Sequence, residues 1–278
     1  MTTISEIIAA RIKQARTMKG WSRAQLAALA GLSASSIARY ESGKVFISDD
    51  VLVKIAGAFK LRLSFFFESK GVFIANKNFQ TIGNLTKREQ NQVIETIKGR
   101  VENLVKAIGL FDDRPIPVFE LQAENILSLN DAFDFAVSLS RKWGITHESN
   151  LIKTIESKGI LFVEVEGVTV KFNGLTATIN GFPVIAVNSK TPSQQRMAIS
   201  HELAHLLGIE SEELCDAFSR GIPEKDEHAS DIEKSSLLED LVWEAWSTEI
   251  IYHNKAARLL GMSESDFQEL VEVRIEKD

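Results

Sequence analysis

The chain has 278 residues and a net charge of −6; 44% of its residues are hydrophobic, and its single cysteine, Cys215, excludes an internal disulfide. Residues 1–68 hold ten basic and five acidic residues, a charge of +5, so the remainder carries −11 and only the N-terminal part is suited to bind a polyanion. No apolar run approaches the roughly 18 residues of a membrane span, and Glu6 and Arg11 interrupt any signal peptide, so we expect a cytoplasmic protein.

Residues 4–59 are predicted to form four short helices. The first spans 4–19, and its apolar side chains recur at helical spacing on one face: Ile4, Ile8, Ile12 and Ala15. Each of the other three follows a serine that can accept a hydrogen bond from its first turn: Ser22, Ser33 and Ser48. The second and third helices are joined through Ala30-Gly31-Leu32, a glycine turn that predicts a helix-turn-helix unit whose second helix enters the major groove of DNA.

The sequence S-R-A-Q-L-A-A-L-A-G-L-S-A-S-S-I-A-R-Y-E-S-G-K, within residues 4–68, resembles the Cro/C1-type (XRE) family of helix-turn-helix domains. The resemblance implies a transcriptional regulator that binds a double-stranded DNA operator, commonly as a homodimer. It also implies an ion pair between Arg16 and Glu41. The alternative is a four-helix bundle that contacts another protein.

The candidate DNA-binding side chains lie on and around the second and third helices. Ala34, Ser35 and Ser36 begin the third helix, where side chains reach base edges, and Arg39 is expected to read guanine or to bind phosphate. The family usually has glutamine where this chain has Arg23, which preserves a phosphate contact but not an amide contact to a base. The full candidate set is Arg23, Ser33, Ala34, Ser35, Ser36, Arg39 and Lys44.

A connector follows the first domain. Its apolar residues 61–80 are expected to pack against that domain. A long helix is predicted over 86–111, with a narrow apolar stripe close to heptad spacing: Val93, Ile97, Val101, Leu104 and Ile108. Two interpretations stay open, a dimerisation or spacer helix and a helix that lies on the next domain. The sequence D-D-R-P-I-P-V-F marks a break near residue 115.

Two helices and then strands are predicted beyond the break. The helices lie within 125–143 and 148–158, and the strands are expected at 160–166, 174–179 and 182–188. Asn180-Gly181 predicts a type I′ hairpin between the last two strands. We expect the strand at 182–188 to be an edge strand that can bind an extended peptide by strand addition.

A capped helix that carries two histidines comes next. Thr191, Pro192 and Gln194 suit its cap, first and third positions, and it is expected to stop at Gly208. His201 and His205 fall one turn apart on one face, close enough to share a tetrahedral zinc ion. Glu202 could then take a proton from a water molecule that zinc activates. The alternative is a buried amphipathic helix with two hydrogen-bonded core histidines, because H-E-x-x-H is only moderately specific.

A catalytic zinc needs a third protein ligand. Ser211 can cap a further helix on which Glu212 and Asp216 lie four apart, which assigns Glu212 as the ligand and Asp216 as the residue that holds the free ring nitrogen of a liganding histidine. Other candidates for the third ligand remain: Glu213, His228 and His253.

Residues 119–220 resemble the ImmA/IrrE family of zinc metallopeptidase domains, which often follow an XRE domain. Three stretches carry the resemblance: F-N-G-L-T-A-T-I-N-G-F-P-V-I-A-V-N, Q-R-M-A-I-S-H-E-L-A-H-L-L and E-E-L-C-D-A-F-S. The resemblance implies cleavage of a helix-turn-helix repressor in phage, mobile-element or stress control, although other members are fused regulators or antitoxins. The chain departs from the family pattern at S-R-G-I-P-E-K-D-E, where the last of these helices ends early.

The sequence thus predicts an α+β protein: an all-α helix-turn-helix domain, then a zincin-like domain of helices with a small β-sheet, then C-terminal helices. The expected divisions are 1–68, a connector at 69–118, a metallopeptidase-like domain at 119–220 and a helical segment at 221–278. In that last segment A-A-R-L-L-G-M-S-E-S-D-F looks like a second helix-turn-helix, but its acidic surroundings favour packing or a protein partner over DNA. The functional hypothesis is a DNA-binding regulator with a zinc endopeptidase that cleaves a repressor or antitoxin-like protein. The alternative is a non-proteolytic repressor or antitoxin whose second domain senses a ligand or binds a partner.

Overall fold

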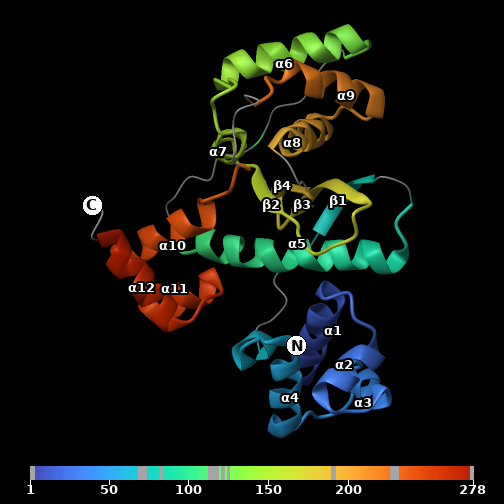
Figure 1. Ribbon diagram of the computed structural model, residues 1–278, viewed down its shortest axis with the longest axis vertical. Helices are drawn as coiled ribbons and strands as arrows, with labels where there is room; N and C mark the ends of the chain where they lie inside the picture. The colour runs from blue at the N-terminus through green and yellow to red at the C-terminus, as the bar shows by residue number, and fades with distance from the viewer. Residues whose placement is uncertain are drawn as a thin grey trace. The chain divides into compact units, whose positions relative to one another are not determined.

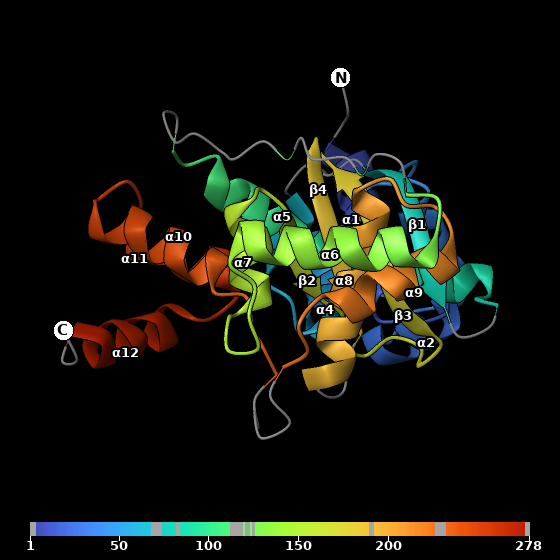
Figure 2. The same cartoon turned by 90° about the horizontal axis from the view of Figure 1, so that it is seen from above.

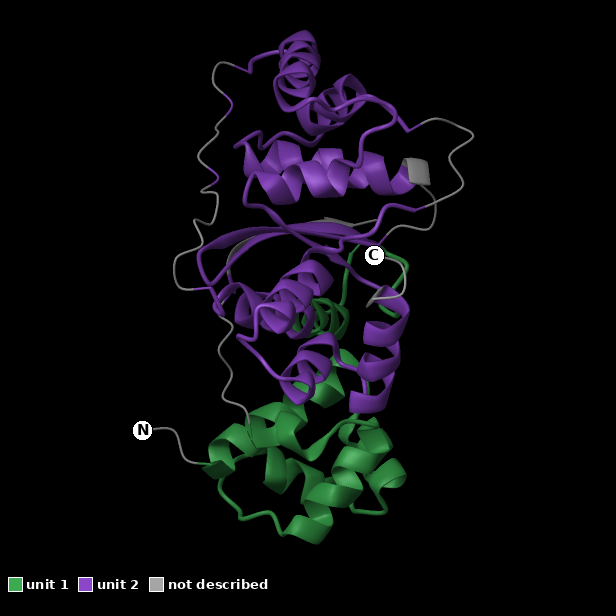
Figure 3. Ribbon diagram, turned by 90° about the vertical axis from the view of Figure 1, so that its left-hand side faces the viewer, with its two compact units in different colours: residues 1–72, 83–98, 167–171 green, residues 73–82, 99–166, 172–278 purple. Residues whose placement is uncertain are grey.

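The computed structural model describes residues 4–67, 74–81, 84–111, 119, 123, 126–188, 192–225 and 232–275. The chain divides into two compact units, one of residues 1–72, 83–98 and 167–171 and the other of residues 73–82, 99–166 and 172–278 (Figure 3). Within the described ranges, no helix is long and apolar enough to cross a membrane.

The first unit contains the four predicted helices, in the predicted order: α1 (Ile4–Met18), α2 (Arg23–Ala30), α3 (Ala34–Glu41) and α4 (Asp49–Phe59). Ser22 and Ser33 cap α2 and α3 by accepting hydrogen bonds from backbone N–H groups, whereas Ser48 makes no such side-chain bond. Gly31 adopts the left-handed conformation that the turn between α2 and α3 requires, with φ of 64°. A 3₁₀ helix, η1 (Leu63–Phe67), completes this core by packing on α1 and α4.

The predicted long helix is α5 (Lys87–Ile108), and the boundary between the two units falls within it. Its apolar stripe is buried at four of the five expected positions, and the fifth, Ile108, is half-buried. The stripe is therefore covered within a single chain, which favours internal packing over a free dimerisation face.

The second unit contains a four-stranded sheet in the order β1-β3-β4-β2: β1 (Ile74–Thr81), β2 (Leu161–Glu164), β3 (Phe172–Ile179) and β4 (Phe182–Val187). Strands β3 and β4 form the predicted hairpin, with Asn180 and Gly181 both at positive φ (50° and 86°) as a type I′ turn requires. Strand β2 pairs with β4 in parallel, and β1 pairs with β3 in antiparallel fashion.

Two expectations about this sheet are wrong. Strand β4 is not an edge strand, because β3 and β2 occupy its two sides and β2 pairs with Val184–Val187, so a peptide cannot add to β4 as a further strand along this stretch. The segment 61–80 does not pack as one piece on the first domain either. Its part from Ile74 belongs to β1, which pairs with β3, a strand about a hundred residues later in the chain.

Three helical layers cover one face of the sheet, as Figures 1 and 2 show. Helix α8 (Pro192–Leu206) packs on β3 and β4, α9 (Glu212–Gly221) packs on α8, and α6 (Leu129–Trp143) packs on α9. The approach of α9 to α6 is so close that a Cβ atom on Gly221 would lie 2.5 Å from the carbonyl oxygen of Phe133. A short helix, α7 (Leu151–Ser157), contacts β2.

The C-terminal part forms three helices: α10 (Leu237–Ser247), α11 (His253–Leu260) and α12 (Glu264–Ile275). Gly261, with φ of 73°, ends α11 and gives α11 and α12 the helix-turn-helix connection that the sequence suggested. A buried ion pair anchors the segment before α10 to α8, because Arg196 Nη1 lies 3.2 Å from Glu233 Oε1 and both side chains are almost fully buried.

Candidate metal centre and nucleic-acid interface

Helix α8 is buried without a break from Ile199 to Ala204, so its polar side chains lie inside the unit beside its apolar ones. Ile199, Leu203 and Leu207 enter the hydrophobic core, and Gly208 ends the segment with φ of 90°. His201 and His205 lie one turn apart, with their ring centroids 5.0 Å from each other. Thr191, the expected cap, lies outside the described residues.

Hydrogen bonds orient both imidazole rings. Nδ1 of His201 lies 2.9 Å from Asp216 Oδ1, and Nδ1 of His205 lies 2.9 Å from the carbonyl oxygen of Ile209. Because a carboxylate and a carbonyl only accept, each Nδ1 carries a proton, and in the neutral form of each ring Nε2 is the nitrogen with the lone pair. Asp216 thus lies beside Nδ1 of His201, the ring nitrogen that would not bind the metal, as the sequence predicted.

Glu212 faces both Nε2 atoms. Its Oε2 lies 3.2 Å from Nε2 of His201, and its Oε1 lies 3.7 Å from Nε2 of His205. Nε2 of His201 is buried and makes no hydrogen bond with any described residue. Two lone pairs and a carboxylate repel each other at this range unless a cation or a proton lies between them. Two histidines and one carboxylate are also a ligand set of catalytic zinc sites, so these residues fit the metal.

Burial lowers the pKa of His205, although the hydrogen bond to the Ile209 carbonyl opposes the shift. A lowered pKa keeps the imidazole neutral, which is the form that binds a metal ion.

Glu202 is fully buried between α8 and the sheet. The hydroxyl of Thr176 on β3 donates to its Oε2, whereas its Oε1 has no hydrogen-bond partner among the described residues. The pKa of Glu202 is raised to about 8, chiefly by burial; the Thr176 hydrogen bond acts in the opposite sense, and the charge of Glu212 adds to the rise. A carboxyl group with one free oxygen next to two candidate ligands is suited to accept and return a proton.

Glycine at the strand position opposite Glu202 leaves room for the carboxyl group. A Cβ atom on Gly174 of β3 would lie 2.3 Å from Glu202 Oε1, so any larger residue there would force the Glu202 side chain to shift. Neither Gly174 nor Thr176 was expected to have a role in the site. The available signal was a glycine inside a strand, which often marks a close approach of another group.

A second group of potential ligands includes the only cysteine. Ligand atoms of His201, His205 and Cys215 lie within 4.8 Å of one another. However, Cys215 Sγ lies 3.5 Å from Nδ1 of His205, the nitrogen that already bonds Ile209, and not beside the free Nε2. Burial, followed by neighbouring carboxylates, raises the pKa of this thiol to about 12. We therefore prefer Glu212 as the third ligand, because its oxygens face both free nitrogens.

The other proposed ligands have different positions. Glu213 is exposed next to Glu212 on α9, and His228 lies outside the described residues. His253 begins α11, where its Nδ1 lies 3.3 Å from the indole N–H of Trp246 and its ring packs against Trp246 and Phe267. It is therefore part of an aromatic cluster.

In the first unit, Glu41 at the end of α3 binds two arginines. Arg16 Nε lies 2.5 Å from Glu41 Oε1, as the family resemblance implied, and Arg23 Nε lies 2.8 Å from Glu41 Oε2. The Glu41 side chain is 1% exposed, whereas that of Arg23 is 50% exposed. Arg23 therefore fixes α2 to α3 while half of its surface remains open to solvent.

The start of α3 presents small polar groups. Ser33 Oγ lies 2.8 Å from the hydroxyl oxygens of both Ser35 and Ser36 and accepts from the backbone N–H of Ser36. Ser33, Ala34 and Ser35 are exposed and Ser36 is half-buried. Among the candidate cations, Arg39 and Lys44 are exposed. All seven candidate DNA-binding residues thus have surface available to a ligand.

Residues 12–66 match the helix-turn-helix family. The N-terminal unit therefore carries an XRE-type helix-turn-helix domain, as found in DNA-binding transcription regulators. No curated protein and no solved structure matches the chain. The family match ends before the residues that resemble the ImmA/IrrE family, so the metallopeptidase resemblance stays a prediction.

Proposed function

We propose that this transcription regulator also carries a zinc-dependent endopeptidase in its second unit. His201, His205 and Glu212 would hold the ion, Asp216 would orient His201, and Glu202 would be the general base. One observation carries the proposal. The Glu212 carboxylate lies 3.2 Å from Nε2 of His201 and 3.7 Å from Nε2 of His205, and the buried Glu202 is next to His201 on the same helix.

The metal ion and the side chains around it would have different roles in the reaction. A bound zinc ion would supply Lewis acidity, which polarises a peptide carbonyl and makes water nucleophilic at neutral pH. Oε1 of Glu202, which has no other hydrogen-bond partner among the described residues, would take the proton and return it to the leaving amine. Thr176 holds Oε2 in place, so Glu202 would present the same oxygen in each step.

The proposed substrate class follows from the DNA-binding domain in the same chain. That domain would bring the peptidase to DNA sites where regulators bind, so we propose that it cleaves a helix-turn-helix repressor, an antitoxin-like protein or a second copy of this chain. On its double-stranded operator the regulator would act as a homodimer, as the XRE resemblance implies.

The experiment uses a library of unstructured peptides of mixed sequence. The zinc-loaded chain should generate new amino termini, detected by mass spectrometry, and Glu202→Gln should lower their rate of formation by roughly 10²–10⁴-fold, the usual contribution of a general base. Equal cleavage by the wild type and by Glu202→Gln would contradict the mechanism. No cleavage by a zinc-loaded wild type would contradict the peptidase itself.

A further inference from the structure

The helix-turn-helix domain belongs to a compact unit that is larger than the family match. The match ends at residue 66, but residues 83–98 and 167–171 group with residues 1–72 in the first unit, drawn in green in Figure 3. These two added segments hold four basic and two acidic residues, a charge of +2. The first half of α5 is therefore a basic part of the unit that carries the DNA-binding domain.

Side chains of α5 hold the end of α1. Nη2 of Arg88 donates to the carbonyl oxygen of Gly20, and Nε2 of Gln92 donates to that of Met18 over 3.4 Å. Arg23, a candidate phosphate ligand at the start of α2, comes three residues after Gly20. At most about 11 Å of chain can separate the two residues, so the α5 contact lies close to the expected DNA interface.

Three cations at this contact have no counter-charge. Lys19 directly precedes Gly20, and Lys87 directly precedes Arg88. The side chains of Lys19, Lys87 and Arg88 are exposed, and none of them forms an ion pair with any described residue. Like charges that gather on one surface repel each other, and a polyanion that binds there relieves the repulsion.

The acidic residues in this part of α5 are already paired. Glu89 accepts hydrogen bonds from the backbone N–H and the hydroxyl of Thr86, and its carboxylate lies 3.9 Å from Nζ of Lys171. Glu95 lies 3.4 Å from Nζ of Lys98. These carboxylates therefore do not neutralise the three exposed cations.

Helix stability explains only some of these positions. Lys19 and Arg88 lie at the C-terminal end of α1, where carbonyl groups favour a cation. Lys87, however, is the first residue of α5, and the helix dipole disfavours a cation in the first turn. An external anion would account for all three positions.

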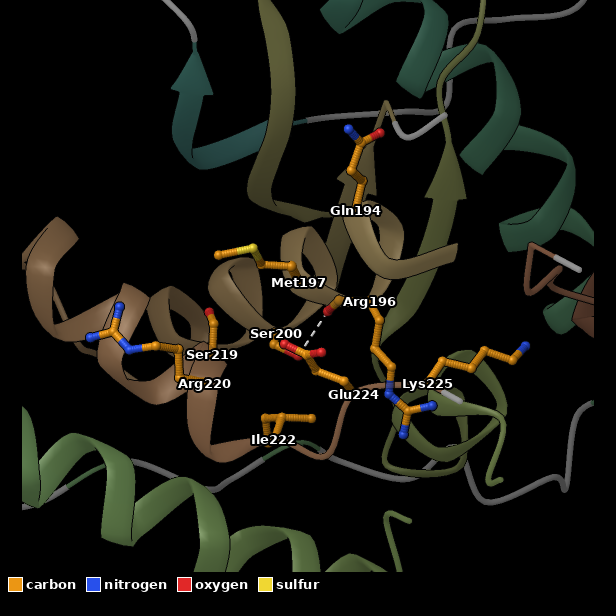
Figure 4. A pocket seen from close by; sticks show the side chains of 9 residues that line it. All are labelled: Gln194, Arg196, Met197, Ser200, Ser219, Arg220, Ile222, Glu224 and Lys225. Carbon is orange, nitrogen blue, oxygen red and sulfur yellow. Dashed lines mark hydrogen bonds between the residues drawn. The ribbon is translucent and has the colours of Figure 1, made fainter. Parts of the chain in front are cut away.

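The second unit has cations in a different arrangement. Figure 4 shows Arg196, Arg220 and Lys225 around a pocket that is also lined by Glu224. Arg196 Nη1 lies 3.2 Å and Lys225 Nζ lies 3.7 Å from Oε1 of Glu233, so one carboxylate binds both. Arg220 is exposed and forms no ion pair with the described residues, but it is a single such cation in the acidic part of the chain.

We propose that Lys19, Lys87 and Arg88 form a second phosphate-binding edge of the DNA-binding unit. This edge contacts the backbone of double-stranded DNA beside the phosphates that α2 and α3 reach. The duplex carries one negative charge per about 1.7 Å of its axis, so phosphates are available along the whole basic surface. The contact adds affinity without sequence information. It extends the DNA interface beyond the family match and does not depend on the proposed peptidase.

The test measures how many phosphates the full-length chain binds. Fluorescence anisotropy follows its binding to two duplexes of unrelated sequence at several salt concentrations. Each of Lys19→Ala and Lys87→Ala should make the dependence of log affinity on log salt concentration shallower by about 1, and the double variant by about 2, equally for both duplexes. These two lysines are chosen because, unlike Arg88, their side chains hold no backbone carbonyl of the described residues, so the contact between α5 and α1 stays intact.

Arg220→Ala is the matched control, because it removes one exposed cation without an ion pair and changes the net charge equally. It should leave the salt dependence unchanged. Four results would overturn the inference: an unchanged slope in the double variant, an equal change in Arg220→Ala, a loss that occurs with only one duplex, or a wild type that binds neither duplex.

Discussion

Glu202 shows how one buried side chain depends on residues from a distant strand. Thr176 holds one of its oxygens, and Gly174 leaves the space that the other occupies. The hydrogen bond from Thr176 and the space left by Gly174 fix the orientation of the Glu202 carboxyl group, so the two strand residues position it for proton transfer.

Replacing Gly174 with alanine tests this arrangement. The added Cβ would lie 2.3 Å from Glu202 Oε1, so Glu202 has to move, and we expect the free energy of unfolding to fall by roughly 1–3 kcal/mol, as for other overpacked sites. Chemical denaturation measures the change. Gly57→Ala in α4 is the control, because a Cβ there would meet nothing within 4 Å, and it should cost nothing. Equal stability of Gly174→Ala and the wild type would contradict the close approach.

At the scale of elements, local signals predicted local structure well. Ser22 and Ser33 cap the helices that follow them, and Asn180-Gly181 forms the hairpin turn. The order of the strands was not predictable in the same way. Strand β4 is an interior strand only because β2 pairs with it in parallel, and β1 pairs with β3, which comes about a hundred residues later in the chain. Pairing between strands that are distant in the chain depends on tertiary packing, so the sequence of either strand alone does not identify its partner.

The candidate site also combines local signals with long-range packing. The spacing of residues along two helices indicated His201, His205, Glu212 and Asp216 as neighbours but left Glu213, His228 and His253 as alternative third ligands, and the distances place Glu212 and Asp216 beside the histidines. Gly174 could not be identified from its neighbours, since its role depends on how closely α8 lies on β3.

The contact between α7 and the segment before α10 should make stability depend on pH. Burial raises the pKa of Glu156 to about 7, opposed by a hydrogen bond from Ser235 and supported by the charge of Asp240. The native state therefore keeps this proton up to about pH 7, whereas the unfolded state loses it near 4.5. The contribution to stability is complete below pH 4.5 and is lost as the pH rises through 7.

Glu156→Gln keeps a neutral side chain at every pH. Its free energy of unfolding relative to the wild type should therefore rise between pH 5 and pH 8, by up to roughly 3 kcal/mol, measured by urea denaturation. A difference that does not change over this pH range would contradict the raised pKa.

At the scale of the whole molecule, the charge distribution and the family match both indicate that the N-terminal part binds DNA. The +5 charge of residues 1–68 coincides with the helix-turn-helix domain at 12–66, and the remainder of the chain is acidic. A polyanion is therefore attracted to one end of the sequence, and Arg39 and Lys44 are exposed there.

Binding to double-stranded DNA should depend on these two cations. Each of Arg39→Ala and Lys44→Ala should make the dependence of log affinity on log salt concentration shallower by about 1, because one phosphate contact is lost. Fluorescence anisotropy with a mixed-sequence duplex at several salt concentrations measures the slope. Lys255→Ala, in the C-terminal helices, should leave it unchanged. The same slope in all four proteins would place the DNA contact elsewhere.

The most direct test of the central claim is the zinc content of the purified chain, measured by elemental analysis. We predict about one zinc per chain in the wild type, loss of the metal in His201→Ala and Glu212→Ala, and retention in Glu213→Ala, which removes the neighbouring carboxylate from the same helix. A folded wild type that takes up no zinc, or a Glu212→Ala variant that retains it, would contradict the metal centre described above.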